Sequence, residues 1–186
     1  EENARTILGT VPVEPDGSAY FKVPARRPLL FQALDRNGFA YQTMRSVTYV
    51  QPGERVSCAG CHEERLRAPR NSRVQALRLP PASLDPGWSD RRPFSFSRVV
   101  QPILDRHCVS CHGLDRTEGE VDLTGTPEGP FTRSYLALAG GERGERLVPR
   151  YPAFNPIQTT QPGGRIGALG SGLLRMLQKG HGEVEL

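Results

Sequence analysis

Two short cysteine motifs constrain this chain more than any other feature of its sequence. Residues 58–62 read Cys-Ala-Gly-Cys-His and residues 108–112 read Cys-Val-Ser-Cys-His, and together they contain all four cysteines. Two thiols one helical turn apart can reach the two vinyl positions on one edge of a porphyrin, and the following histidine can then bind the iron axially. The spacing therefore predicts two covalently attached haem c groups. The residues expected to hold them are Cys58, Cys61, Cys108 and Cys111 through their thiols and His62 and His112 through their imidazoles.

Two other interpretations of paired cysteines fit the spacing less well. Zinc ribbons separate their two Cys-x-x-Cys halves by roughly 15–20 residues. The interval between Cys61 and Cys108 is more than twice as long. A redox-active dithiol has no use for a histidine after both pairs. Zinc binding and dithiol chemistry therefore stay as minor alternatives to haem.

The composition suits a chain that wraps a rigid cofactor. Of the 186 residues 20 are Gly and 17 are Pro, hydrophobic residues make up 37%, and the chain has one Trp and two Met. A chain so rich in turn-forming residues builds neither long helices nor a deep aliphatic core, and two haems would supply the missing apolar mass. The length fits one domain of ordinary size or two small ones.

The distribution of charge argues against a nucleic-acid partner. The net charge is +4, from 22 Arg and 2 Lys against 20 acidic residues, and the two signs are interspersed along the chain. The propionates of two haems would bring the net charge to about zero. Arginine is the natural partner for these propionates, because its planar fork donates hydrogen bonds in pairs.

The expected compartment follows from chemistry rather than from a targeting segment. No stretch approaches the roughly 20 apolar residues that span a bilayer, and the start of the chain, Glu-Glu-Asn, shows no signal peptide. Haem is attached to thiols outside the cytoplasm, so we expect an exported, periplasmic or extracellular protein without a membrane span. The chain is then a mature, processed form or a piece of a longer protein.

The residue pattern predicts an α+β fold with high loop content. Residues 1–57 should form a small antiparallel β-meander or sandwich that leads into the first motif. Residues 58–93 should carry the first haem motif and an Arg/Pro-rich connector. Residues 94–186 should form a cytochrome c-like helical part, with the second haem and a C-terminal helix that supplies a ligand.

Individual elements can be placed within these three parts. The expected strands cover 7–13, 19–23, 29–34 and 39–50, with turns at 15–18 and 35–38. A helix is expected within 94–113, with Ser97 as a plausible N-cap and Pro102 as a kink or as the true start. A short helical turn is expected over 133–139 and a last helix over 172–179.

Counting histidines assigns the distal ligands. The chain has four, so two remain once His62 and His112 are placed under their haems. His181 follows a helix end in a Gly-flanked turn that lets its ring be aimed, and we expect it to bind the second iron. His107 directly precedes Cys108 and cannot easily reach the far face of the same haem, so we expect it on the iron of the first haem.

Alternatives stay open for both distal positions. His181 could be an exposed residue of the tail, and His107 could hydrogen-bond a propionate or cap a turn. Met44 is the chief rival for the first iron, where a thioether ligand would raise the reduction potential. Met176 lies on the apolar side of the expected last helix, which makes it a core residue.

Several stretches around these motifs resemble a known family. Residues 9–13 (Gly-Thr-Val-Pro-Val) and 16–24 (Asp-Gly-Ser-Ala-Tyr-Phe-Lys-Val-Pro) lead to Gln-Thr-Met-Arg-Ser at 42–46 and to the first motif. Gln-Pro-Ile-Leu-Asp-Arg-His at 101–107 precedes the second motif, and Lys-Gly-His at 179–181 ends the pattern. Together they resemble the dihaem c-type cytochrome region of proteins related to the hydrazine synthase alpha subunit.

The resemblance has one implication for each haem. It implies that His181, in Lys-Gly-His, is the distal ligand of the second haem. Catalytic members of the family differ at the first haem, where a tyrosine lies one helical turn beyond the motif histidine. This chain has Leu66 at that place, which removes the phenol ligand and argues against hydrazine-forming chemistry.

These inferences favour electron transfer as the function. Two six-coordinate haems leave no open position for a substrate, and closely packed haems suit one-electron relay to redox partner proteins. Loops and polar termini fray unless contacts tie them down, so we also expect a homo-oligomer or filament, that is, a homopolymeric extracellular haem chain.

The alternative is a haem enzyme or enzyme subunit of the hydrazine synthase alpha-related type with an open site at the first haem. A third interpretation, a β-domain that serves only for docking, is weaker because it gives the haems no function.

Overall fold

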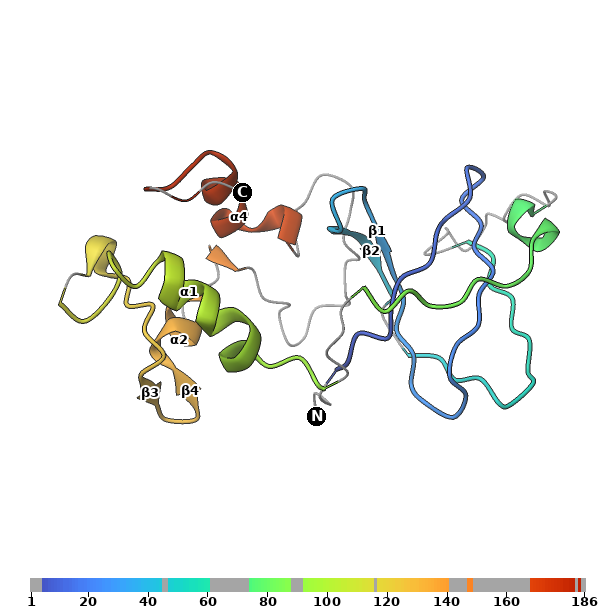
Figure 1. Cartoon of the computed structure of the whole chain (residues 1–186), viewed down its shortest axis with the longest axis horizontal. Helices are drawn as coiled ribbons and strands as arrows, with labels where there is room; N and C mark the ends of the chain where they lie inside the picture. The colour runs from blue at the N-terminus through green and yellow to red at the C-terminus, as the bar shows by residue number, and fades with distance from the viewer. Residues whose placement is uncertain are drawn as a thin grey trace, which may run out of the picture. The chain divides into compact units, whose positions relative to one another are not determined.

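The computed structural model describes residues 5–44, 47–60, 74–87, 92–115, 117–140, 147–148, 168–182 and 184 (Figure 1). The chain forms two compact units. The first comprises Glu1–Leu30 and Ser46–Phe94, and the second Phe31–Arg45 and Ser95–Leu186. Within the described ranges the α-helices have seven residues each and the strands two to four. None of the described helices combines the length and apolar character that crossing a bilayer requires.

In the first unit, two expected strands are bridged to the connector that follows the first motif. Thr10 and Asp85 exchange both backbone hydrogen bonds, at 2.8 and 2.9 Å, and Phe21 is bridged to Ala82 in the parallel sense. Gly9 permits this approach, because a Cβ there would lie 2.5 Å from the carbonyl oxygen of Asp85. The connector thus takes part in the fold of the first unit. The β-meander and the cytochrome c-like part remain predictions.

The turn at 15–18 holds the connector at a second place. The Asp16 carboxylate accepts hydrogen bonds from the Ser18 hydroxyl (2.6 Å) and from the backbone N–H of Gln75 (2.8 Å). The Ser18 hydroxyl oxygen accepts in turn from the N–H of Ala76 at 3.0 Å. These bonds satisfy two N–H groups at the start of the 3-10 helix η1 (Gln75–Arg78), which would otherwise have no partner within the helix.

In the second unit, β1 (Gln32–Leu34) and β2 (Ala40–Thr43) form an antiparallel hairpin. The chain reverses at 35–38, where a turn was expected. Asp35 Oδ1 accepts from the N–H groups of Asn37 and Phe39, at 2.9 Å each, and this stabilises the turn.

Two helices of the second unit follow the expected pattern and carry side-chain caps. α2 (Arg133–Ala139) begins after Thr132, whose Oγ1 accepts from the N–H of Tyr135 at 3.2 Å. α4 (Gly172–Gln178) begins after Ser171, whose Oγ accepts from the N–H of Leu174 at 3.2 Å. The short elements around them are the 3-10 helices η3 (Glu118–Glu120) and η4 (Ala168–Gly170) and the hairpin of β3 (Pro127–Glu128) and β4 (Phe131–Thr132).

The helix that leads into the second motif starts differently from the prediction. α1 (Gln101–His107) has Pro102 in its first turn and is preceded by a π-helix, η2 (Phe96–Val100). The assignment of Ser97 as N-cap is wrong, since Ser97 lies inside η2 and is exposed. Pro102 marks the start of the α-helical part because it cannot donate a backbone hydrogen bond.

The core of the second unit is a cluster of three leucines. Leu104 of α1, Leu123 of the following loop and Leu138 of α2 are each less than a tenth exposed. Partly buried side chains pack around them, among them Phe96, Val100, Cys108, Val109, Leu147 and Leu173. The cluster therefore joins η2, α1, the second motif and α4.

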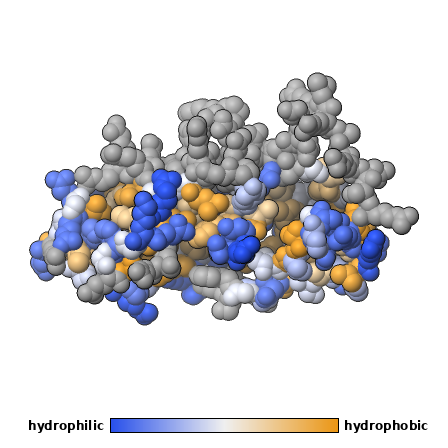
Figure 2. Space-filling model, turned by 90° about the horizontal axis from the view of Figure 1, so that it is seen from above, coloured by the Kyte–Doolittle hydropathy of each residue, from blue (hydrophilic) through white to orange (hydrophobic). Residues whose placement is uncertain are grey.

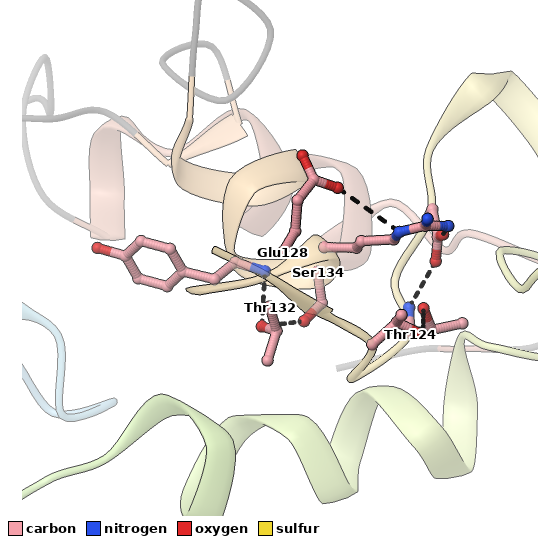
Figure 3. A network of polar contacts seen from close by, with 8 residues as sticks. Thr124, Glu128, Thr132 and Ser134 are labelled. Carbon is pink, nitrogen blue, oxygen red and sulfur yellow. Dashed lines mark hydrogen bonds and ion pairs between the residues drawn. The ribbon is translucent and has the colours of Figure 1, made fainter. Parts of the chain in front are cut away.

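A buried polar network crosses the same core. Ser134, fully buried in α2, donates from its hydroxyl to Gln101 Oε1 at 2.5 Å. Gln101 Nε2 donates to the carbonyl oxygen of Leu123 at 3.0 Å and to Asp105 Oδ1 at 2.7 Å. Thr132 and Ser134 also share a hydroxyl–hydroxyl bond of 2.8 Å, visible in Figure 3. The network fixes α2 against α1 (Figure 1), because Gln101 of α1 bonds both to Ser134 of α2 and to the loop residue Leu123.

An ion pair extends this network to the β3–β4 hairpin. Arg133 Nη1 donates to Asp122 Oδ2 at 3.1 Å, and Arg133 Nε lies 3.5 Å from Glu128 Oε2 (Figure 3). Burial acts to raise the pKa of Asp122, but hydrogen bonds from Thr124 and Arg133 together with the Arg133 charge outweigh it, and the pKa lies below its usual 3.8.

The buried network predicts a difference between two serine substitutions. Ser134→Ala removes a donor from Gln101 inside the core, and we expect a loss of about 1–3 kcal/mol in unfolding free energy. Ser97→Ala is the matched control, because Ser97 is exposed within η2, and it should change stability by less than about 0.5 kcal/mol. Urea unfolding followed by circular dichroism measures both. Equal effects would contradict the account of the core.

The Asp16 turn predicts a pH dependence of stability. The hydrogen bond from the Ser18 hydroxyl, followed by that from Gln75 N–H, holds the pKa of Asp16 below its usual 3.8. The native form thus binds the proton less strongly than the unfolded chain. The stabilisation is fully present above the unfolded value and is lost as the pH falls through the lower native value.

Ser18→Ala removes the largest cause of that shift. We expect it to raise the pKa of Asp16 toward 3.8, as measured by a carboxyl-carbon NMR titration. An Asp16 titration that does not move in Ser18→Ala would show that the turn is not the cause.

Candidate functional site

The second motif begins at the C-terminal end of α1. The N–H of Cys108 donates to the carbonyl oxygen of Leu104 at 2.8 Å, which makes Cys108 the C-cap of the helix. The chain then continues as a tight turn, in which the N–H groups of Cys111 and His112 both donate to the carbonyl oxygen of Cys108, at 3.1 and 2.9 Å. The two thiols and the imidazole are thus presented on one backbone turn.

The backbone of His112 is held from the opposite side by the following loop. Its carbonyl oxygen accepts from the N–H of Leu123 at 2.8 Å, and His112 is bridged to Thr117. Gly113 is buried next to it, where a Cβ would lie 2.6 Å from the carbonyl oxygen of Val109. Only glycine fits this position, because the backbone that follows His112 packs directly against the carbonyl group of Val109.

The environment of Cys108 favours an uncharged sulfur. Cys108 packs against the leucine cluster and is partly buried, as is Cys111. Burial raises the pKa of the Cys108 thiol above its usual 9.0, because desolvation disfavours the thiolate.

The rings of His112 and His181 lie together. Their centroids are 5.9 Å apart and their planes are inclined by 17°. The side chain of His112 is half-buried, and its Nδ1 is buried without a hydrogen-bond partner, whereas His181 is exposed. The structure therefore brings the rings of His112 and His181 together in a stacked arrangement.

The other candidate ligands of the described segments lie elsewhere in the fold. His107 is the last residue of α1 and is exposed. Met44 follows β2 and is half-buried, and its Sδ accepts a hydrogen bond from the N–H of Phe31 at 3.3 Å. Met176 is half-buried in α4.

The first motif is described only in part. Cys58 is exposed, and Gly60 has a φ of 73°, a left-handed conformation that suits glycine. Cys61, His62 and Leu66 lie outside the described residues, so their assigned roles remain predictions. In the part of the chain that the structure describes, no group of three or more His, Cys, Asp or Glu side chains is placed to hold a bare metal ion.

Two features of the second site were not identified from the sequence. Gln101 of α1 is hydrogen-bonded to Ser134 of α2, and Val184 is bridged to His181. Gly180 and Gly182, which flank His181, signalled a turn at that point, but no local pattern paired Gln101 with Ser134.

Comparison with known proteins gives one match, over the first part of the chain. The family model of the hydrazine synthase alpha subunit middle domain matches residues 1–63. The matched segment ends one residue beyond His62 and so includes the complete first motif. This supports a relation to the hydrazine synthase alpha subunit over residues 1–63, while the second motif and the Lys-Gly-His tail lie outside the match. No curated protein and no solved structure matches.

Proposed function

We propose that this chain is an exported dihaem c-type cytochrome that transfers electrons. One haem c would be attached through Cys58 and Cys61 above His62, and the other through Cys108 and Cys111 above His112. The observation that carries the proposal is the pairing of the His112 and His181 rings beside the second pair of thiols. When bound, haem iron supplies a one-electron ferric–ferrous couple.

The proximity of the two rings suits imidazoles that would hold one iron between them. The centroids of His112 and His181 are 5.9 Å apart. The Nδ1 of His112 is buried without a hydrogen-bond partner, so this imidazole has an unsatisfied nitrogen that a metal or a further polar group would satisfy.

The surroundings of the second motif suit the neutral sulfur of a thioether. Burial disfavours the charged form of Cys108 and raises its pKa. A thioether is neutral and loses nothing on entering an apolar environment. The leucine cluster beneath Cys108 is such an environment.

Exposed apolar side chains flank the motif and suit an apolar macrocycle. Ile103 and Leu114, five residues before Cys108 and two after His112, are 57% and 65% exposed. Hydrophobic side chains also reach the surface between hydrophilic ones in several places on the face drawn in Figure 2. Burial of Ile103 and Leu114 against a haem would stabilise the chain by roughly 25 cal/mol per Å² of apolar area removed from water.

A second candidate function follows from the family match. The relation of residues 1–63 to a subunit of hydrazine synthase favours a haem enzyme or enzyme subunit with an open position at the first iron. His107 and Met44 are the two candidate ligands that would close this position. His107 is exposed at the end of α1, whereas Met44 would have to lose the hydrogen bond that it accepts from the N–H of Phe31. With His107 on the first iron, both haems are closed to substrate and the relay function holds.

The partners follow from the relay function. Two closed haems exchange electrons only with other redox centres, so the partners are redox proteins or further copies of this chain. In the second case the protomers form a homopolymeric haem chain in the periplasm or outside the cell. Protein that stays monomeric and monodisperse at high concentration would contradict the filament, though not the relay.

His181 provides the direct test of the second site. In wild-type protein matured with haem, we expect the second iron to be low-spin and closed to carbon monoxide when reduced. His181→Ala should open it, so that one of the two haems binds carbon monoxide and shows a high-spin ferric band. Optical spectroscopy of the oxidised and reduced protein measures both signals.

Two further variants sharpen this test. Lys179→Ala, an exposed neighbour at the C-cap of α4, should leave the spectra unchanged. His107→Ala reports on the first haem separately: new carbon monoxide binding there supports the relay, and binding already present in wild type supports the enzyme. A His181→Ala protein with wild-type spectra would remove His181 as the distal ligand.

A further inference from the structure

We propose that the turn His181–Val184 is a positioning device that sets the plane of the His181 ring nearly parallel to that of His112, with Gly182 as its positioning residue. The inference rests on the proposed function and concerns how the second site is tuned rather than which residue binds the iron. The inference assigns a role to the β-bridge between His181 and Val184, a residue that belongs to neither cysteine motif.

The backbone of His181 is held by its own turn. Its N–H donates to the carbonyl oxygen of Val184 at 3.0 Å, and the N–H of Val184 donates back to the carbonyl oxygen of His181 at 3.1 Å. Gly180 and Gly182, on either side of His181, have φ values of 83° and 60°. Both values lie in the left-handed region, which glycine adopts without steric cost. The turn therefore restricts the direction in which the His181 side chain leaves the backbone.

The turn is connected to the same core as His112. Leu173 of α4 packs against the leucine cluster, as Cys108 and Val109 of the second motif do. The hydroxyl of Ser171, at the start of α4, donates to the carbonyl oxygen of Leu147 at 2.5 Å, and Ser171 is buried. The backbone segments that carry both histidines thus pack against one set of leucines, and the two ring planes are inclined by 17°.

The angle between two axial imidazole planes controls the electronic structure of ferric iron. Each imidazole donates π-density into the iron d orbital perpendicular to its own plane. Parallel planes act on the same orbital and split the pair, whereas perpendicular planes act on both and leave them nearly equal. We therefore expect a rhombic low-spin electron paramagnetic resonance signal from the second haem, rather than a single feature at large g.

Gly182 can be tested without a steric clash. A Cβ at Gly182 would meet nothing within 4 Å, so Gly182→Val acts only through the backbone conformation. A β-branched residue in the left-handed region costs about 1–2 kcal/mol, which shifts the balance between the bridged and the opened turn roughly tenfold toward the opened form. Gly129 has the same φ of 60° and the same open space, in the turn between β3 and β4. Gly129→Val is therefore the matched control.

The experiment compares the resonance spectra of the ferric, haem-loaded wild type, Gly182→Val and Gly129→Val. His181→Ala identifies the second haem, because it removes that signal. We expect a rhombic signal in wild type and Gly129→Val, and its loss or replacement by a large-g feature in Gly182→Val. Gly182→Asn should restore it, since asparagine tolerates the left-handed conformation.

The outcomes separate this inference from the proposed function. A large-g signal in the wild type, or identical spectra for the two valine variants, overturns the inference while bis-histidine haem stands. Protein without covalent haem overturns the proposed function itself, and a second haem that His181→Ala does not affect removes His181 as its distal ligand and this inference with it. Circular dichroism of each variant establishes that the fold is retained, and the wild-type spectrum decides the parallel-plane claim even if Gly182→Val does not fold.

Discussion

The packing of Leu104, Leu123 and Leu138 is the interaction on which the second unit depends. Each buried leucine contributes about 1.5–3 kcal/mol by leaving water, and the cluster contacts both Cys108 and Leu173. The motif with His112 and the helix that precedes His181 therefore share one support, although they are far apart in sequence. A chain with few apolar residues can position two histidines in this way without an extensive core.

Hydrogen bonds from polar side chains stabilise turns and helix starts that a larger apolar core would stabilise in other proteins. Asp16, Asp35, Thr132 and Ser171 each accept hydrogen bonds from backbone N–H groups at a turn or a helix start. Such bonds satisfy groups that a short helix or turn leaves without partners. They fix the loops locally and leave apolar surface near the second motif uncovered, at Ile103 and Leu114. A bound macrocycle would complete the apolar contacts that the polypeptide alone does not make.

The features that the sequence predicted are local ones. The turn at 35–38 follows from Asp-Arg-Asn-Gly, and the helical segments expected over 133–139 and 172–179 correspond to α2 and α4. The bridges from Thr10 and Phe21 to residues 82–85, and the bond between Ser134 and Gln101, join distant segments that carry no matching pattern. Ser97 failed as a cap because a π-helical turn precedes α1. His112 and His181 were expected on one iron, and the fold brings their rings together, whereas iron binding itself stays a proposal.

Covalent haem at both cysteine motifs is the claim on which the electron-transfer account rests, and the intact mass of the protein, produced in a host that attaches haem c, tests it most directly. The account predicts the mass of the polypeptide plus two haem groups, unchanged under denaturing conditions because the links are thioethers. Colourless protein with the mass of the bare chain, or with a metal ion that denaturation releases, would contradict it.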